Sequence, residues 1–527
     1  MREVTDIAKV TAKGGVHLLW GLVASTVISA VGSIFIARLL GSDLYGLYTV
    51  TLAAPALLAV FRDWGVTSAM IRSTAQCRAE NRTDEVRGIF VSGYVFVIAL
   101  GVTLSAVSLV FSDFIAASVF NRPHIASLIQ IASFVILAEG LTSAAAAAFV
   151  GTERMELNSV MLIAQSVIKT LIVIALVVFG LGPLGAVIGH VSGAAIAGVF
   201  GLLLVWTIYR NLPKPFTAKL HLKTRIATML QYGVPLSISY IITAFQVQFY
   251  NFLLPIYYTT DNVMIGNYGV AQNFVVLIGF FATPITIMLF PAFSKLNAQK
   301  DRQTLQTFYQ YSVKYASLLV VPVASLVMCL SEPAVSTLFG NTYNTAPLFL
   351  ALLAITYLYT PVGNLSNINL INSQGQTKFV LLLTLVTAVI GFPMASVLVL
   401  NFGVLGLIAA SLTAVIPSLA IGIRYIRKQY GVTVDWESSA RILVASAIAA
   451  AVTFAVTYQL GFSSWIRLII GVVLFVAALV PAVMFTRSVN RSDISNLREL
   501  TSGLGPIAKL SKSALNILER IMNILKL

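Results

Sequence analysis

Apolar runs long enough to cross a lipid bilayer recur along the whole chain, with short polar segments between them. A membrane-spanning helix needs about 20 mainly apolar residues, and about fourteen such runs occur. Hydrophobic residues make up 58% of the 527 residues and charged residues 10%, against about 25% charged in soluble domains, which excludes a soluble globular protein. The sequence therefore predicts an all-α polytopic membrane protein with spans near 16–37, 44–66, 88–111, 125–150, 157–180, 184–208, 229–255, 262–290, 309–330, 346–371, 379–400, 403–426, 440–460 and 464–486.

Basic residues fall almost entirely on one side of this alternating topology. With the N-terminus inside, the outer segments hold only Arg38, Arg122 and Arg467 of the 34 Lys and Arg residues. Arg62 and Lys169 lie within spans. This asymmetry satisfies the positive-inside rule and predicts an even number of spans with both termini cytoplasmic. The net charge of +15 therefore reflects topology, and no nucleic-acid partner is expected.

The chain resembles itself at an offset of about 220 residues. Gly46 and Tyr48 align with Gly266 and Tyr268, and the offset persists across six spans. Repeats of six helices are parallel, a geometry that suits alternating access. We therefore predict two pseudo-symmetric six-helix lobes at 1–210 and 211–430, an appended helix pair at 431–487 and a cytoplasmic amphipathic tail at 488–527.

The predicted tail has apolar residues at helical spacing among Lys and Arg residues. Such a helix binds the anionic inner leaflet through its basic residues. Docking of a partner protein is the alternative role for the same pattern.

Ionisable side chains inside predicted spans mark a candidate site in the first lobe, because such groups are costly in a bilayer. Glu139 and Lys169 lie near the middles of consecutive spans and are expected to meet as an ion pair, either structural or involved in binding or proton coupling. Arg62 and Asp63 lie toward the inner end of the second span, and Arg38 ends the first, facing the cavity or snorkelling to the outer headgroups. A cavity presenting Arg38, Arg62 and Lys169 suits a phosphate or pyrophosphate. Asp63 and Glu139 are the candidate coupling carboxylates.

The second lobe carries amide side chains in its spans in place of charges. Amides either hold helices together or line a water-filled cavity, and together with aromatic rings they suit sugar hydroxyls and apolar sugar faces. His190, in the sixth span, is interpreted as a packing residue, with proton coupling as its alternative role. The candidate glycan-facing residues are Gln246, Gln248, Asn251, Gln272, Asn273, Asn364 and Asn367.

The sequence lacks the motifs of a nucleotide-dependent or metal-dependent enzyme. No Gly-x4-Gly-Lys-Ser/Thr phosphate loop occurs. Cys77 and Cys329 lie far apart, without the spacing of metal ligands. The outer segments are also too short for the catalytic region of a glycan polymerase or ligase. We therefore predict a transporter and no enzyme, with no cofactor and no metal site.

The segment 35–48, Phe-Ile-Ala-Arg-Leu-Leu-Gly-Ser-Asp-Leu-Tyr-Gly-Leu-Tyr, is followed by Asp-Trp-Gly-Val at 63–66. These stretches resemble the polysaccharide transporter (oligosaccharide flippase) family of the multidrug/oligosaccharidyl-lipid/polysaccharide exporter superfamily. The family's motif falls here on Arg38, Gly41, Asp43, Gly46 and Tyr48.

The resemblance implies a flippase in the plasma membrane. Such a protein moves a lipid-linked oligosaccharide, carried on a polyprenyl pyrophosphate, from the inner to the outer leaflet for cell-surface glycan assembly. Its implied partners are the lipid-linked glycan, membrane lipids and glycan-assembly enzymes. The alternative is a cation-coupled multidrug or metabolite antiporter of the same superfamily, in which Asp63 or Glu139 serves as the coupling carboxylate.

Overall fold

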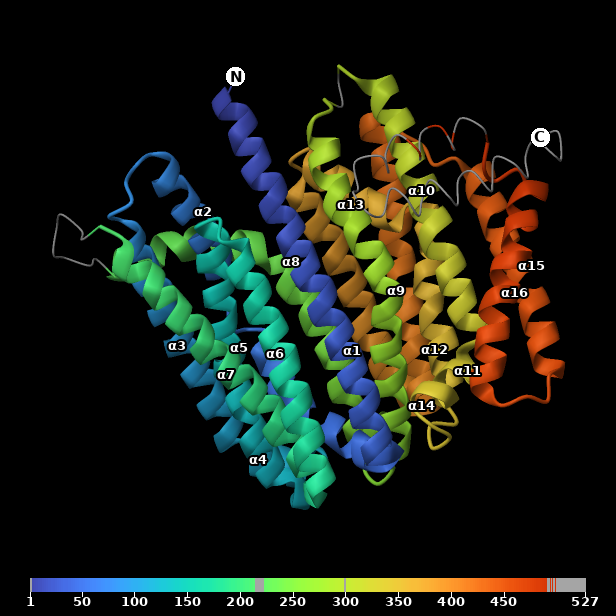
Figure 1. Ribbon diagram of the computed structural model, residues 1–527, viewed down its shortest axis with the longest axis horizontal. Coiled ribbons are helices and arrows are strands. Elements are labelled where there is room, and N and C mark those ends of the chain that lie inside the picture. The colour runs from blue at the N-terminus through green and yellow to red at the C-terminus, as the bar shows by residue number, and fades with distance from the viewer. Residues whose placement is uncertain are drawn as a thin grey trace. The chain divides into compact units, whose positions relative to one another are not determined.

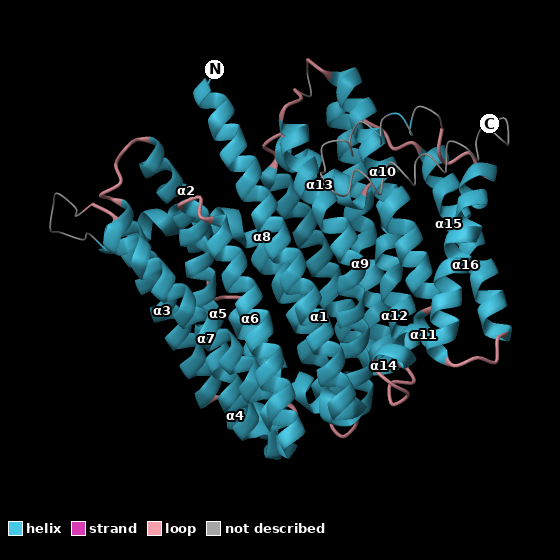
Figure 2. Ribbon diagram, in the orientation of Figure 1, coloured by secondary structure: helices cyan, strands magenta, loops and turns pink. Residues whose placement is uncertain are grey.

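The computed structural model consists of helices joined by short loops (Figures 1 and 2). It describes residues 2–213, 222–297 and 300–490, together with Asp493, Ser495 and Arg498. Within these residues no β-strand occurs, and the all-α prediction is confirmed.

Ten helices in the described residues are long and apolar enough to cross a membrane, or eleven if one bent pair counts as a span. The multi-pass membrane class is thus confirmed, while the number fourteen stays a prediction. The long helices are α1 (Arg2–Ala59), α3 (Val86–Val110), α5 (Ala126–Gly151), α6 (Met155–Leu176) continuing into α7 (Gly182–Asn211), α8 (Leu222–Tyr257), α9 (Asn262–Ser294), α10 (Arg302–Cys329), α14 (Thr377–Tyr430), α15 (Trp436–Gln459) and α16 (Ser464–Phe485).

Breaks interrupt the longest helices between pairs of predicted spans. Gly41 in α1 has φ 71° and Gly403 in α14 has φ 57°, a region of backbone conformation that is open mainly to glycine. A third break, Val177–Leu181, separates α6 from α7. Gly41 lies within the connection expected at 38–43, and the other two breaks lie within a few residues of those expected at 181–183 and 401–402. The long helices are therefore bent at the places where two successive spans require a reversal.

One predicted span, 346–371, is broken in its middle. The chain forms α12 (Ala346–Ala354), a 3-10 segment Ile355–Val362 and α13 (Asn364–Ser373), with a bend of 52°. Gly363, at φ 87°, lies at the bend, two residues after Pro361, which cannot donate a backbone hydrogen bond.

The second predicted span, 44–66, is too long, because its helix ends before residue 66. α1 ends at Ala59, and a non-helical stretch precedes α2 (Val66–Ala79). Arg62 and Asp63 therefore lie in the connection between these helices and not within a span. Asp63 Oδ1 accepts a hydrogen bond of 2.9 Å from the backbone N–H of Thr67, and its Oδ2 accepts one of 2.6 Å from Thr67 Oγ1. Asp63 thus stabilises the start of α2, where N–H groups lack partners within the helix.

The chain divides into two compact units. The first comprises Met1–Asn273 and Thr384–Val415, and the second comprises Phe274–Leu383 and Ile416–Leu527. In the first unit α1 packs along α6, and α5 packs against α3 and α7. In the second unit α15 packs against α16 and α10. The unit boundaries differ from 210 and 430, so the two six-helix lobes and the appended pair stay predictions.

Asp493 anchors the chain beyond α16 to α10 inside the second unit. Its Oδ2 lies 2.6 Å from Lys314 Nζ and accepts a hydrogen bond of 2.7 Å from the Asn490 backbone N–H. Tyr315 donates to Oδ1 at 3.3 Å. The side chains of Lys314 and Asp493 are only 12% and 1% exposed. The predicted amphipathic tail, 488–527, otherwise lies almost wholly outside the described residues.

Replacing Asp493 with alanine is expected to lower the melting temperature of the detergent-solubilised protein by about 5 °C, because leaving one buried charge unpaired costs about 3–5 kcal/mol. Glu437→Ala is the matched control, because it removes the carboxylate of the exposed pair between Glu437 and Arg441. This control is expected to change the melting temperature by about 1 °C or less. Equal melting temperatures for the two variants would contradict an anchoring role for Asp493.

Candidate functional site

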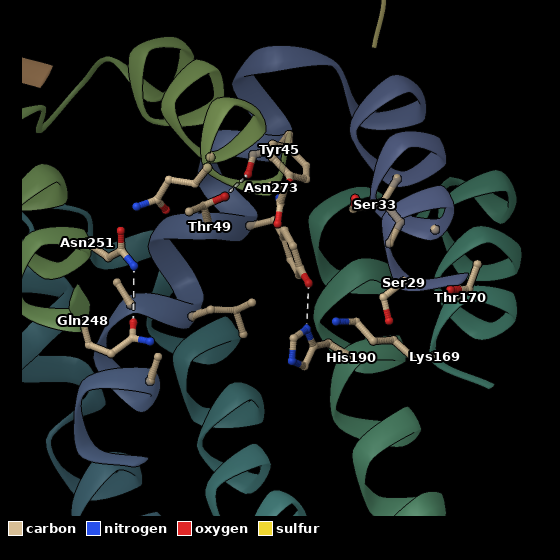
Figure 3. A pocket seen from close by; sticks show the side chains of 18 residues that line it. Ser29, Ser33, Tyr45, Thr49, Lys169, Thr170, His190, Gln248, Asn251 and Asn273 are labelled. Atoms are coloured by element: carbon tan, nitrogen blue, oxygen red, sulfur yellow. Dashed lines mark hydrogen bonds between the residues drawn. The ribbon is translucent and has the colours of Figure 1, made fainter. Parts of the chain in front are cut away.

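A cavity of about 240 Å³ lies within the first unit (Figure 3). Pockets that enclose drug-sized ligands measure about 300–1,000 Å³, so this cavity suits a smaller chemical group. Five helices supply its walls: α1, α6, α7, α8 and α9. The lining residues are Ser29, Gly32, Ser33, Ile36, Tyr45, Tyr48, Thr49, Leu52, Ala53, Ala56, Lys169, Thr170, His190, Gln248, Asn251, Gly269, Gln272 and Asn273.

α1 lines the cavity with both of its halves. Figure 3 shows the ribbon turning over between the half that carries Ser29 and Ser33 and the half that carries Tyr45 and Thr49. Residues four apart lie on the same face of a helix, so each half presents a pair of hydroxyl-bearing side chains to the cavity. The reversal at Gly41 is what allows one continuous segment to supply two walls.

Lys169 is the one Lys, Arg, Asp or Glu residue in the cavity lining. Its helix α6 is closely packed on both sides, since a Cβ atom at Gly193 of α7 would overlap Lys169 and one at Gly32 of α1 would overlap Thr170. Within the described chain no carboxylate lies within ion-pair distance of Lys169. Figure 3 shows its side chain extending beside the ring of His190. The cavity therefore contains a lysine without an ion-pair partner among the described residues, and the carboxylate of Glu139 acts on it electrostatically from beyond that distance.

Two tyrosines of α1 connect the cavity walls through hydrogen bonds. Tyr48 Oη lies 2.7 Å from His190 Nδ1 on α7. Asn273 Nδ2 on α9 donates to Tyr45 Oη at 2.6 Å. His190 therefore both lines the cavity and holds α7 against α1.

Four of the candidate glycan-facing amides lie in the cavity lining: Gln248, Asn251, Gln272 and Asn273. Asn251 Nδ2 donates to Gln248 Oε1 at 3.3 Å, and Gln272 Nε2 donates to Tyr268 Oη at 2.9 Å. The cavity thus has an uncharged wall of hydrogen-bonding groups from α8 and α9 in addition to its lysine.

The other three candidate amides lie outside this cavity. Gln246 is buried and donates to Tyr250 Oη at 2.6 Å. Asn367, in the second unit, is buried and accepts a hydrogen bond of 2.5 Å from Tyr309 Oη. Asn364 is half-buried at the start of α13. The bond of Asn367 joins α13 to α10, which is the alternative role that the sequence left open for amides, whereas the bond of Gln246 stays within α8.

The expected ion pair between Glu139 and Lys169 does not form. Glu139 Oε2 instead lies 2.7 Å from Arg62 Nη1, with side-chain exposures of 31% and 26%. Glu139 pairs with Arg62 in place of Lys169 because α1 ends early, at Ala59. Arg62 then lies in a connection that can reach Glu139 on α5. Arg62 is therefore neutralised by Glu139 and does not line the cavity, and Arg38 is exposed just before Gly41. The structure does not bring the three predicted cations together.

The pair between Arg62 and Glu139 is expected to stabilise the protein by about 1 kcal/mol, because it is only partly buried. Arg62→Ala and Glu139→Ala should each lower the melting temperature slightly, and the double variant should melt no lower than the more affected single variant. Thermal unfolding of the three variants in detergent measures this coupling. Strictly additive losses would show that the two side chains do not interact.

Sequence reasoning missed the hydroxyl-bearing wall of the cavity. Ser29, Ser33 and Thr49 were not among the candidate residues, although Ser25, Ser29 and Ser33 recur at intervals of four along the first predicted span. This polar stripe on an otherwise apolar helix was the available signal.

Comparison with known proteins places the chain in a family. The family described as "Polysaccharide biosynthesis protein" matches residues 35–348. The lipopolysaccharide biosynthesis protein WzxC of Escherichia coli (strain K12) is 25% identical over 354 residues, covering 66% of this chain and 67% of WzxC. The lipid II flippase MurJ of Bacillus subtilis (strain 168) is 23% identical over 380 residues, covering 64% of this chain and 67% of MurJ.

The fold is that of a solved lipid II flippase. The structure of MurJ in an inward closed conformation superposes with a TM-score of 0.68 at 15% identity, covering 89% of this chain and 98% of MurJ. At this identity the likeness shows the fold alone. The family match extends over more than half of the chain and confirms the resemblance found in the segments 35–48 and 63–66. The chain therefore belongs to the polysaccharide biosynthesis protein family.

Proposed function

We propose that this protein is a flippase that moves a polyprenyl-pyrophosphate oligosaccharide from the inner to the outer leaflet by alternating access. Family membership gives the class of transporter, and Lys169 is the observation that carries the choice of substrate. Lys169 is half-buried inside a membrane-spanning helix, where a charge without an ion-pair partner is costly, so the site favours an anionic ligand to compensate it. A phosphate group of the lipid carrier supplies that anion.

The geometry of the cavity supports a division of roles between its walls. Lys169 and the hydroxyls of Ser29 and Ser33 are donors for phosphate oxygens. Gln248 and Asn251, on α8, offer the donors and acceptors that sugar hydroxyls require. We assign the contact with the anionic group to Lys169. Arg38 is assigned to the outer surface, and Arg62 is assigned to the ion pair with Glu139.

The proposal extends to topology and location. Fourteen crossings in two pseudo-symmetric lobes and an appended pair fit the glycine breaks of α1 and α14 and the break between α6 and α7. The distribution of basic residues supports cytoplasmic termini in a plasma membrane. The tail at 488–527 is assigned to the anionic inner leaflet, and enzymes of glycan assembly are the proposed suppliers and users of the substrate.

A thermal-shift comparison tests the substrate class. A ligand that binds only the folded protein raises its melting temperature. We expect a polyprenyl-pyrophosphate disaccharide to raise it, and a polyprenyl glycan without phosphate and an amphiphilic cationic dye to leave it unchanged. Stabilisation by the dye together with no response to the pyrophosphate lipid would contradict the proposal and favour a drug antiporter.

A further inference from the structure

Arg122 is a buried arginine at the connection between α3 and α5, outside the apolar spans. It is 3% exposed. Its Nε donates to the backbone carbonyl of Thr259 at 2.8 Å, and its Nη2 donates to that of Tyr258. Burial lowers the pKa of Arg122, and the nearby carboxylates of Asp43 and Asp261 act in the opposite direction. The guanidinium group is therefore held on carbonyl oxygens, with two carboxylates close by.

The segment that Arg122 holds is the loop between α8 and α9. Tyr258 in this loop also accepts, through its Oη, a hydrogen bond of 3.2 Å from the Val404 backbone N–H. Val404 directly follows Gly403, the break in α14. Beside the arginine, the ring of Phe120 packs against that of Phe252 with centroids 5.1 Å apart. Arg122 thus fixes a loop that in turn contacts the bend of α14, all within the first unit.

A second set of contacts joins α1 to α9 next to the same loop. Asn262 Nδ2 donates to Asp43 Oδ1 at 3.1 Å. One turn further along, the backbones of Gly46 and Gly266 meet, since a Cβ atom on either would overlap a carbonyl oxygen of the opposite helix. Tyr45, which lines the cavity, lies directly between these two contacts in the sequence. The contacts therefore pack α1 against α9 beside Tyr45, a residue of the cavity lining.

These contacts share one side of the membrane in the topology given by the basic residues. The connections that contain Arg122, Tyr258 and Gly403 are all assigned to the outer side. Arg122 and Asp43 belong to the predicted first lobe, and Tyr258 and Asn262 belong to the predicted second lobe. Alternating access requires that such outer contacts form in one state and separate in the other.

We propose that Arg122 is the latch of an outer gate, which holds the α8–α9 loop over the cavity while the cavity is closed to the outside. This inference rests on the proposed function, because a gate has a role only in a transporter that opens to both sides. When the loop moves away, the carbonyl oxygens of Tyr258 and Thr259 leave the guanidinium group. The exposed carboxylates of Asp43 and Asp261 then serve as its partners.

Labelling of a cavity cysteine from the outside tests the latch. The parent is a full-length chain with Cys77→Ser and Cys329→Ser, in which Ala53→Cys places a single thiol in the cavity lining. A membrane-impermeant maleimide is added outside. Arg122→Ala is expected to raise the labelling rate about tenfold, since hydrogen bonds from a charged group are lost. Arg467→Ala, which removes an arginine paired with Glu332 on the predicted outer side, is the matched control and should leave the rate unchanged.

Arg122→Lys keeps the charge but loses the forked donor geometry, so it should label faster than the parent and more slowly than Arg122→Ala. Labelling of Arg122→Ala at the parent rate would overturn the latch. If Arg122→Ala does not fold, a second measurement, made on the parent protein, decides whether the outer gate exists. Asp43→Cys with Asn262→Cys should cross-link and stop labelling of Ala53→Cys, and a reductant should restore it. Unchanged labelling after full cross-linking would overturn the gate.

The outcome is independent of the substrate assignment. Labelling reports access to the cavity and needs no lipid-linked glycan. If Arg122→Ala opens the cavity while no polyprenyl-pyrophosphate lipid binds, the gate stands and the proposed substrate fails. If the lipid binds and is moved while labelling never changes, the substrate stands and the gate fails.

Discussion

Lys169→Ala is expected to slow transport of a polyprenyl-pyrophosphate oligosaccharide on the order of 100-fold, because truncating one partner of a buried charge pair costs about 2–5 kcal/mol. The reason is that Lys169 is the one Lys or Arg residue in the cavity lining and has no ion-pair partner among the described residues. Reconstituted vesicles with a fluorescent substrate measure the rate. Expression and melting temperature should remain near those of the wild type, since Lys169 has no ion-pair partner to lose among the described residues.

Two variants serve as controls for this prediction. Lys169→Arg preserves the charge and should retain a substantial part of the rate. Arg38→Ala removes an exposed basic residue that lies outside the cavity lining and should change the rate less than twofold, as expected for an exposed side chain. Equal losses in Arg38→Ala and Lys169→Ala would contradict a specific anion site and favour a general attraction by surface charge.

Gly46→Ala is expected to lower the melting temperature by several degrees and to remove most transport, because overpacking of a close contact costs about 1–3 kcal/mol. The added methyl group would overlap the backbone carbonyl oxygen of Asn262 on α9, and a carbonyl cannot move away as a side chain can. The helices α1 and α9 must then separate beside Tyr45, which lines the cavity. Thermal unfolding and transport of the same preparation measure both effects.

Gly422→Ala is the matched control, because it makes the same change inside a long helix. A Cβ atom there lies 3.5 Å from Leu383 Cδ1, an ordinary contact. The higher helix propensity of alanine should then leave stability equal or slightly higher. A wild-type melting temperature for Gly46→Ala would show that the contact between α1 and α9 is loose.

The sequence predicted the helical class and the positions of the apolar helices because hydrophobic length is a direct consequence of bilayer thickness. It also predicted connections at 38–43 and 401–402, and the breaks lie at Gly41, inside the first, and at Gly403, directly after the second. It placed the end of the second span too late. The apolar run continues through Val60 and Phe61 in composition, but the hydrogen bonds from Thr67 to Asp63 begin a new helix.

The pairing of charges depended on geometry that the sequence does not contain. Depth in neighbouring spans suggested that Glu139 meets Lys169. The partner of Glu139 is Arg62, which reaches it because α1 ends early. Four of the candidate amides, on α8 and α9, line the cavity, and their contact with a glycan stays a prediction. The hydroxyls of α1 were missed because serine and threonine also occur on packed helix faces.

A leaflet assay tests the central claim most directly. The purified protein is reconstituted in vesicles with a labelled polyprenyl-pyrophosphate oligosaccharide, and accessibility of the label to an external probe is followed over time. Wild-type protein should expose the inner-leaflet label faster than protein-free vesicles do, and Lys169→Ala should return the rate toward that of protein-free vesicles. No acceleration with the wild type, together with ion-driven uptake of an amphiphilic cation, would contradict the flippase and establish an antiporter.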